Sequence, residues 1–203
     1  MKFYNSVGPN PHVVRMFAAE RGITLDKAEV DLMSGENRKA DYLKRNPAGQ
    51  LPCLELDDGS HLSEITAICE YLDEISPGES LLGSTPEERA KTRMWTRRVD
   101  LNICEPMANG FRFSEGLKLF KDRIVTRPEA AEGLKAIAQD RLRWLDGQLA
   151  GREFLCGDKL TLADILLYCF LQFGANVGQP LNPDNRNVLA WFERVKSRPS
   201  AAA

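Results

Sequence analysis

The chain has 203 residues, of which 43% are hydrophobic and 28% are charged, and its formal net charge is −2. This composition is typical of a soluble protein of one or two domains, and the small net charge does not indicate binding to nucleic acid or to an acidic membrane surface. No stretch approaches the ~18 apolar residues of a membrane span, and the first residues are too polar for the core of a signal peptide. We therefore expect a cytoplasmic protein that acts on neither nucleic acid nor a membrane.

The first 75 residues alternate between strand and helix patterns. In chain order they predict a strand at 2–5, a helix that Gly22 stops, strands at 25–32 and 51–56, a return strand at 61–62 and a helix from 65 to about 75. Together with a weakly helical polar stretch that reaches Asn46, this order is typical of a thioredoxin-like domain, a small mixed sheet flanked by helices. We assign residues 1–76 to this domain and residues 77–84, which are rich in Pro, Gly and Ser, to a linker.

Residues 85–203 show helical patterns throughout and are predicted to form an all-helical domain. A helix is expected to begin at the Thr85 cap, and further helices are expected at about 128–149 and 188–198. The strongest local signal is Thr161 followed three residues later by Asp164, a capping box that opens an apolar helix. The alanines at the C-terminus are expected to fray.

Few of the chain's own side chains suit metal binding or nucleophilic catalysis. The five cysteines form no CxxC pair and are odd in number, which argues against a zinc site and a disulfide framework. His12 and His61 are the only histidines, so neither a metal cluster nor His-assisted catalysis is expected.

The most informative segment is residues 46–52, NPAGQLP, a turn that ends in a proline at the mouth of a strand. If the Leu51–Pro52 bond is cis, the N–H and C=O of Leu51 can pair with an extended peptide as an added strand would. Such a site suits a small peptide-like thiol. An ordinary junction between loop and strand is the alternative.

An α/β half, a short linker and an all-helical half in this order resemble the soluble glutathione S-transferases, here of a bacterial type. The resemblance covers the whole chain, and its most specific parts are the turn 46–52, the segment 62–72 (LSEITAICEYL), the capping box 161–164 and the segment 191–199. It implies an α/β thioredoxin-like domain followed by an all-helical domain, glutathione as co-substrate, no metal, a homodimer, and a small hydrophobic electrophile as second substrate.

The resemblance also implies which residues hold glutathione. The backbone of Leu51, next to Pro52, pairs with the cysteinyl part of the tripeptide, and Gln50 contacts its glycyl side. Glu64 and the following Ile65 hold the γ-glutamyl end, where the first N–H groups of a helix attract a carboxylate.

Basic and aromatic residues are candidates for binding the glycyl end of glutathione and the second substrate. Arg38 or Lys39 is a candidate for the glycyl carboxylate, with a solvated helix face as the alternative. In the helical domain, Arg97, Phe111 and Arg112 are candidates for the second-substrate pocket, with solvated or dimer-contacting charge as the alternative for the arginines.

Two positions depart from the family pattern. The serine that usually follows the γ-glutamyl-binding glutamate is replaced by Ile65, which removes one side-chain donor worth ~1.5–3 kcal/mol to a charged partner. The hydroxyl that usually activates the thiol falls on Gly8. Asn10 and Ser6 are therefore the candidates for contact with the thiolate, since an amide N–H₂ can stabilise the anion and lower the pKa of the thiol. Asn10 could instead serve an Asx turn at the start of the helix.

The sequence thus predicts a glutathione transferase whose bound thiolate attacks a hydrophobic electrophile. Two other functions stay open. Asn10 beside the missing hydroxyl suggests glutathione-dependent reduction of disulfides or peroxides, because Gly8-Pro9-Asn10 resembles the Thr-Pro-Asn of a bacterial branch that favours this reaction. Gly8 and Ile65 would also suit a non-catalytic binding or scaffold protein that keeps the fold.

Overall fold

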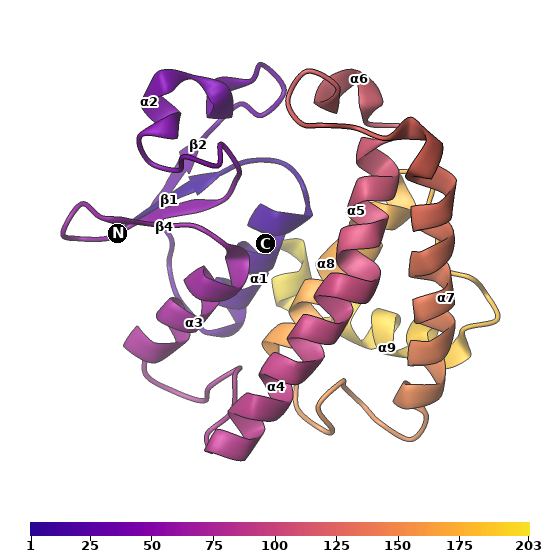
Figure 1. Ribbon diagram of the computed structural model, residues 1–203. Coiled ribbons are helices and arrows are strands. Elements are labelled where there is room, and N and C mark those ends of the chain that lie inside the picture. The colour runs from indigo at the N-terminus through magenta and orange to yellow at the C-terminus, as the bar shows by residue number, and fades with distance from the viewer. The chain divides into compact units, whose positions relative to one another are not determined.

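The chain divides at Ser84 into two units in the computed structural model, which describes residues 1–203 (Figure 1). The first unit holds residues 1–84 and also residues 199–203, and the second holds residues 85–198. We expected residues 199–203 in the helical domain, whereas the structure groups them with the first unit. None of the helices combines the length and the hydropathy that crossing a bilayer requires.

The first unit is built on a four-stranded sheet with the order β2-β1-β3-β4. The strands are β1 (Lys2–Asn5), β2 (Lys27–Glu29), β3 (Cys53–Glu55) and β4 (His61–Leu62). β1 runs parallel to β2 and antiparallel to β3, and β3 runs antiparallel to β4. β2 and β3 are shorter than predicted. The chain leaves β2 in a turn where Asp31 accepts the N–H groups of Met33 and Ser34, and Pro52 has no N–H with which to extend β3.

Helices cover both faces of this sheet, as the prediction of a thioredoxin-like domain requires. α1 (Pro9–Glu20) and α3 (Ile65–Ile75) pack together on one face, and Figure 1 shows α2 (Ala40–Leu43) on the other side. A 3₁₀ turn, Glu36–Arg38, leads into α2. The core under α2 consists of the buried side chains of Tyr4, Val30, Tyr42, Leu51 and Cys53.

The C-terminal residues do not fray, so that expectation is wrong. Pro199–Ala202 form a 3₁₀ helix that packs on α1, and Ala201 is 7% exposed. The Ala201 carbonyl lies 3.2 Å from His12 Nε2, and the Ser200 hydroxyl donates to Glu20. Burial lowers the pKa of His12, which favours the neutral ring in this contact. Polar groups on α1 thus hold the segment in place.

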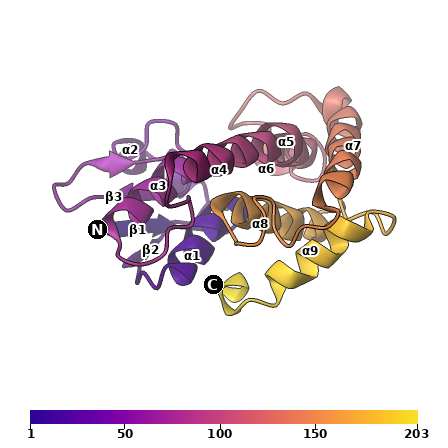
Figure 2. The same cartoon turned by 90° about the horizontal axis from the view of Figure 1, so that it is seen from below.

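The second unit contains helices throughout its length, which confirms the predicted class. Its helices are α4 (Pro86–Val99), α5 (Glu105–Arg112), α6 (Leu117–Phe120), α7 (Ala131–Leu149), α8 (Leu162–Asn176) and α9 (Arg186–Lys196). A π-helical turn, Asp100–Cys104, joins α4 to α5 as one long helix, and α8 lies between this helix and α9 (Figures 1 and 2). Thr85 caps α4 as predicted: it accepts the N–H of Glu88, whose side chain accepts the N–H of Thr85.

Asp164 is the polar centre of the helical unit. Its side chain is fully buried and accepts hydrogen bonds from the Leu155 N–H (2.9 Å), the Thr161 N–H (3.0 Å), the Thr161 hydroxyl (2.9 Å) and Trp191 Nε1 (2.9 Å). The predicted pairing of Thr161 with Asp164 is confirmed. The carboxylate also ties the start of α8 to α9 and to the preceding loop, which the local pattern did not indicate.

We expect Asp164→Ala to lower the free energy of unfolding by ~3 kcal/mol or more, because each buried donor left unsatisfied costs ~1–3 kcal/mol. Urea unfolding of the full chain measures this loss. Asp158→Ala, at an exposed position six residues earlier, is the control and should change the free energy by less than ~0.5 kcal/mol. Equal effects of the two substitutions would contradict the role of Asp164 as an anchor.

Candidate functional site

The strand register gathers three chain segments at one edge of the sheet. Tyr4 pairs with Cys53 and Leu54 pairs with Leu62, both in antiparallel fashion. β1 therefore ends beside the start of β3, and β4 ends at the same edge. The loop 6–8 that leads into α1, the segment 51–52 and the start of α3 consequently lie together there.

Leu51 presents unused backbone groups at this edge. The Leu51–Pro52 bond is cis, the geometry on which the predicted peptide site depended. Neither the N–H nor the C=O of Leu51 makes a hydrogen bond within the chain, although the residue is only 8% exposed. Buried backbone groups are nearly always paired. These two groups are therefore available to an extended peptide.

Side chains from the α2 region hold the turn that precedes Leu51. Tyr42 Oη and Asn46 Nδ2 both donate to the Gln50 carbonyl, at 2.7 and 2.9 Å, and Asn37 Nδ2 donates to the Gly49 carbonyl at 2.6 Å. Asn37 and Asn46 are buried, 2% and 3% exposed. With the Gln50 carbonyl already bonded twice, its exposed side chain is the part of Gln50 that can meet a ligand.

Arg38 lies along the same turn. Its Nη1 is 3.4 Å from the Ala48 carbonyl, and a side chain at Gly49 would meet that nitrogen at 3.0 Å. Arg38 Nε is buried without a hydrogen-bond partner. The guanidinium thus lies along the Ala48–Gly49 part of the turn that leads to Gln50.

The start of α3 is open to an anion. Glu64 is the N-cap, and neither its side chain nor any other caps the helix. The first hydrogen bond runs from Ile68 N–H to the Glu64 carbonyl, so the N–H groups of Ile65, Thr66 and Ala67 have no partner within the helix. Glu64 also has φ 68° and ψ 120°, the one non-glycine residue of the chain with positive φ. Such strain costs on the order of 1–3 kcal/mol and gathers at functional sites.

Asn10 occupies the first turn of α1. Pro9 and Pro11 flank it and have no N–H, so Asn10 supplies the donor that this turn directs outward. Its half-buried side chain makes no hydrogen bond within the chain and does not cap the helix. The alternative role in an Asx turn therefore has no support in the structure.

Gly8, on which the sequence resemblance places the activating hydroxyl, is the N-cap of α1 with φ 107° and ψ 171°. This backbone region is essentially restricted to glycine. A Cβ atom at Gly8 would meet no other atom within 4 Å, so the backbone and not crowding excludes other residues.

The other hydroxyl and thiol groups near the end of β1 are hydrogen-bonded or buried. The Ser6 hydroxyl donates to the Val30 carbonyl at 2.6 Å, and Ser6 is 6% exposed. Tyr4 Oη donates to Glu55 at 2.6 Å, and burial followed by this bond raises the pKa of Tyr4. Cys53 is fully buried, and burial raises the pKa of its thiol to about 11.

The second-substrate candidates lie in the helical unit. Phe111 packs edge-on against Phe120 and Phe173, with ring centroids 6.1 and 5.0 Å apart, and the Arg112 guanidinium lies 5.9 Å from the centre of the Phe120 ring. Phe111 and Arg112 therefore share one partly exposed aromatic cluster. Arg97 does not join it, because fourteen residues of continuous helix separate it from Phe111, about 20 Å at 1.5 Å per residue.

Sequence reasoning missed a pocket on the helical unit. It has a volume of about 180 Å³ and is lined by Arg98, Val99, Asn102, Ile103, Arg141 and Trp144. Residues 137, 141 and 144 follow one another at helical spacing on one exposed face, and this pattern could have indicated the pocket. Sequence reasoning also missed Asn37 and Tyr42, whose contacts with the turn are long-range.

Known proteins share this arrangement of a thioredoxin-like unit, with its open sheet edge, followed by an all-helical unit. Residues 7–75 match the family model for the N-terminal domain of glutathione S-transferases, and residues 115–199 match the model for the C-terminal domain. Both models describe domains of one family, the glutathione S-transferases, and they match in chain order.

Individual relatives match most of this chain. A glutathione S-transferase domain-containing protein of Marinobacter aquaeolei VT8 has a crystal structure that is 37% identical, with a TM-score of 0.93 over 98% of this chain and 99% of that one. Glutathione S-transferase 2 of Saccharomyces cerevisiae is 30% identical over 95% of this chain and 84% of its own length. Human elongation factor 1-gamma is 32% identical over 82% of this chain and 36% of its own length. The chain belongs to the glutathione S-transferase family.

We expect Gly8→Ser, which restores a hydroxyl at the family's usual position, to lower the free energy of unfolding by ~1–3 kcal/mol because of its backbone conformation. Chemical unfolding measures the change. Gly147→Ser is a matched control, since Gly147 lies inside α7 with open space around it and should lose nothing. A Gly8→Ser protein as stable as the parent would refute the backbone argument.

Proposed function

We propose that this protein is a cytoplasmic glutathione transferase that conjugates the glutathione thiolate to a hydrophobic electrophile. The observation that carries the proposal is the meeting, at one sheet edge, of the unbonded Leu51 backbone, the uncapped start of α3 and the unbonded Asn10 amide. A peptide with an anionic end and a thiol between its ends matches these three groups.

Each part of glutathione has a proposed partner at this edge. The N–H and C=O of Leu51, adjoining Pro52, pair with the cysteinyl backbone. The first N–H groups of α3, beginning at Ile65, bind the γ-glutamyl carboxylate, and the Glu64 carboxylate binds its ammonium group. The three free N–H groups in the first turn of α3 compensate in part for the side-chain hydrogen bond that is lost because Ile65 replaces the serine of the family pattern.

On the glycyl side, Arg38 binds the glycyl carboxylate and Gln50 contacts the adjoining part of the tripeptide. The position of the Arg38 guanidinium along the turn, with Nη1 3.4 Å from the Ala48 carbonyl, supports this role.

The thiol is activated by stabilising its anion. Asn10 donates a hydrogen bond to the sulfur, and the positive end of the α1 dipole favours the same charge. The Ser6 hydroxyl already donates its hydrogen bond to the Val30 carbonyl, so we assign the contact with the thiolate to Asn10 and not to Ser6. The chain then supplies orientation and charge stabilisation while glutathione supplies the nucleophile.

The helical unit binds the electrophile. The aromatic cluster around Phe111 offers an apolar surface for a flat organic molecule, and Arg112 beside it can meet an acidic group. Arg97 lies too far along the helix to contact the same small molecule. We therefore do not include it in the second-substrate pocket and regard it as a surface charge.

We expect Asn10→Ala to raise the pKa of the bound glutathione thiol by about 1–2 units, because a hydrogen bond to a charged group is worth ~1.5–3 kcal/mol. Asn10→Asp should raise it further, since a carboxylate repels the thiolate. A pH titration of the thiolate absorbance of bound glutathione measures both shifts.

Asn176→Ala, at an exposed end of α8, is the control and should leave the titration unchanged. A bound thiol with the pKa of free glutathione in the parent protein would reject the transferase mechanism. A lowered pKa that Asn10→Ala leaves unchanged would instead assign activation to the helix dipole.

Glutathione-dependent disulfide reduction is the second candidate. The supporting observation is that the start of α1 offers the amide of Asn10 to the glutathione thiol, and no hydroxyl, because residue 8 is glycine. Cys53 is buried and cannot act as the reducing thiol, so glutathione itself would be the reductant. Fast turnover of small disulfides together with poor conjugation of aryl halides would establish this reaction in place of conjugation.

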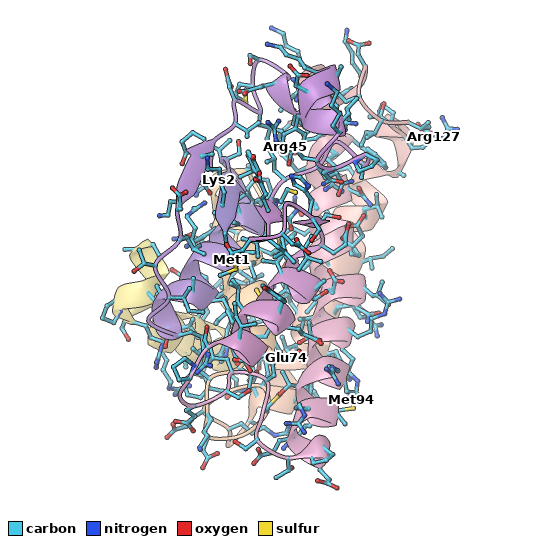
Figure 3. All side chains as sticks on the ribbon, turned by 90° about the vertical axis from the view of Figure 1, so that its left-hand side faces the viewer. Met1, Lys2, Arg45, Glu74, Met94 and Arg127 are labelled. Carbon is cyan, nitrogen blue, oxygen red and sulfur yellow. The ribbon has the colours of Figure 1, made fainter.

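We further propose that the protein is a homodimer that buries a patch of the helical unit. Met94 and Leu101 on the α4 helix and its π turn, and Ile137 and Trp144 on α7, are 40–50% exposed. Each pair is seven residues apart, so each lies along one helix face. The pocket beside Trp144 lies between the two helices, and Figure 3 shows Met94 projecting outward from α4. Apolar side chains that gather on one face are a feature of association sites.

We expect Leu101→Lys to convert the dimer to a monomer of 22.8 kDa, because it adds charge to a patch that already carries Arg98 and Arg141. Sedimentation velocity measures the mass. Val125→Lys, at a residue 75% exposed outside the patch, should remain dimeric. A monomeric parent protein, or a dimer that survives Leu101→Lys, would contradict the proposed interface.

A further inference from the structure

Arg15 joins three separate segments of the first unit. It lies in α1 about two turns from the start of the helix. Its Nη1 donates to Asn5 Oδ1 at 2.7 Å and to the Ser6 carbonyl at 3.3 Å, and its Nε donates to the Ala203 carbonyl at 3.2 Å. One guanidinium therefore contacts the end of β1, the loop after it and the C-terminal 3₁₀ segment.

The loop that Arg15 contacts has little other support. Ser6 and Val7 make no backbone-to-backbone hydrogen bonds, and Val7 is 63% exposed. The Ser6 hydroxyl anchors one side of the loop on Val30, and Arg15 anchors its carbonyl. Side chains, and not a backbone ladder, fix the position of this loop.

The partner of Arg15 is itself held in place. Asn5 is 8% exposed, and its Nδ2 donates to Glu29 Oε1 at 2.7 Å. The amide oxygen of Asn5 is therefore oriented toward Arg15 while its nitrogen binds β2. Glu29, Asn5 and Arg15 form a chain of hydrogen bonds that links β2 to α1 across the end of β1.

Through Arg15, this chain of hydrogen bonds reaches the loop that leads to Asn10. Ser6, Val7 and Gly8 connect β1 directly to the first turn of α1. A shift of the loop moves Asn10 relative to the Leu51 backbone, which the bonded turn before it holds in place. Activation of a bound anion is sensitive to such a shift, because displacements near 1 Å can cost ~100-fold in rate.

We propose that Arg15 is a positioning residue for thiol activation. By binding the Asn5 side chain and the Ser6 carbonyl, it fixes the loop 6–8 and thereby the distance from Asn10 to the sulfur of bound glutathione. This inference rests on the proposed function. Arg15 acts through the loop and does not touch the thiol.

The arginine side chain is specifically suited to this role. Its planar group presents several donors in a fixed geometry, so it can span two acceptors on the loop and a third on the C-terminal segment. Lysine has the same charge but a single ammonium group at the end of a flexible chain. A lysine at position 15 would therefore keep the field of the charge and lose the bridge.

The test compares Arg15→Lys and Arg15→Gln with the parent protein. In both variants the pKa of the bound thiol should rise by about one unit, which lowers the thiolate fraction about tenfold at pH values below that pKa. The kcat for conjugation of an aryl halide should fall by the same factor at neutral pH and recover as the pH is raised. The KM for glutathione should stay within about twofold, because Leu51 and α3 provide the binding contacts.

Glu20→Ala is the matched control. Glu20 lies on the last turn of α1 and accepts a hydrogen bond from Ser200, so its loss weakens the attachment of the C-terminal segment without touching the loop. We expect a lower Tm and an unchanged thiol pKa. Tm values of the Arg15 variants, read beside this control, separate loss of stability from loss of positioning.

The outcomes distinguish this inference from the proposed function. A parent protein that binds glutathione without lowering its thiol pKa rejects the transferase mechanism, whatever the variants do. A lowered pKa in the parent that both Arg15 variants retain overturns the positioning role. Retention in Arg15→Lys with loss in Arg15→Gln also overturns it, because the charge and not the bridge would then be responsible.

Discussion

The antiparallel register of β1, β3 and β4 is the constraint on which the site depends. Tyr4 opposite Cys53 and Leu54 opposite Leu62 place the end of β1, the start of β3 and the end of β4 at one edge. A shift of one residue would turn Tyr4 and Cys53 away from the core under α2 and would separate Leu51 from the starts of α1 and α3. The buried contacts of Tyr4 with Tyr42 and Cys53 therefore fix the geometry of a site that lies beyond them.

At this edge, backbone groups that a folded chain normally pairs are left unpaired. Leu51, the first residues of α3 and Asn10 together keep donors and an acceptor without partners, while the turn beside them is bonded by Asn37, Tyr42 and Asn46. The contrast has a physical meaning. Rigid support next to unsatisfied groups preorganises a site, because the ordering cost is met during folding and not during binding.

The two departures from the family pattern have different physical consequences. Ile65 removes a side-chain donor but keeps its N–H at the start of α3. Gly8 removes the hydroxyl and adopts a backbone conformation that serine cannot adopt without strain, so the chain around it is built for glycine. The proposed charge stabilisation by Asn10 requires a free donor, and the side-chain amide of Asn10 makes no hydrogen bond within the chain. In the helical unit, by contrast, the fully buried Asp164 accepts four hydrogen bonds, an environment that is typical of a structural anchor.

Much of the fold follows from the sequence alone. Period-two and helical patterns, the Thr85 and Thr161 caps and the turn at 46–52 are local, so they determined the fold class and the segments from which the site is built. Tertiary structure decided which of these segments meet. It engaged Ser6 with Val30, left Asn10 unbonded, and fixed the C-terminal alanines on α1. These outcomes depend on contacts between residues far apart in the chain, and spacing along a sequence carries no information about such contacts until the strand register and the helix packing are known.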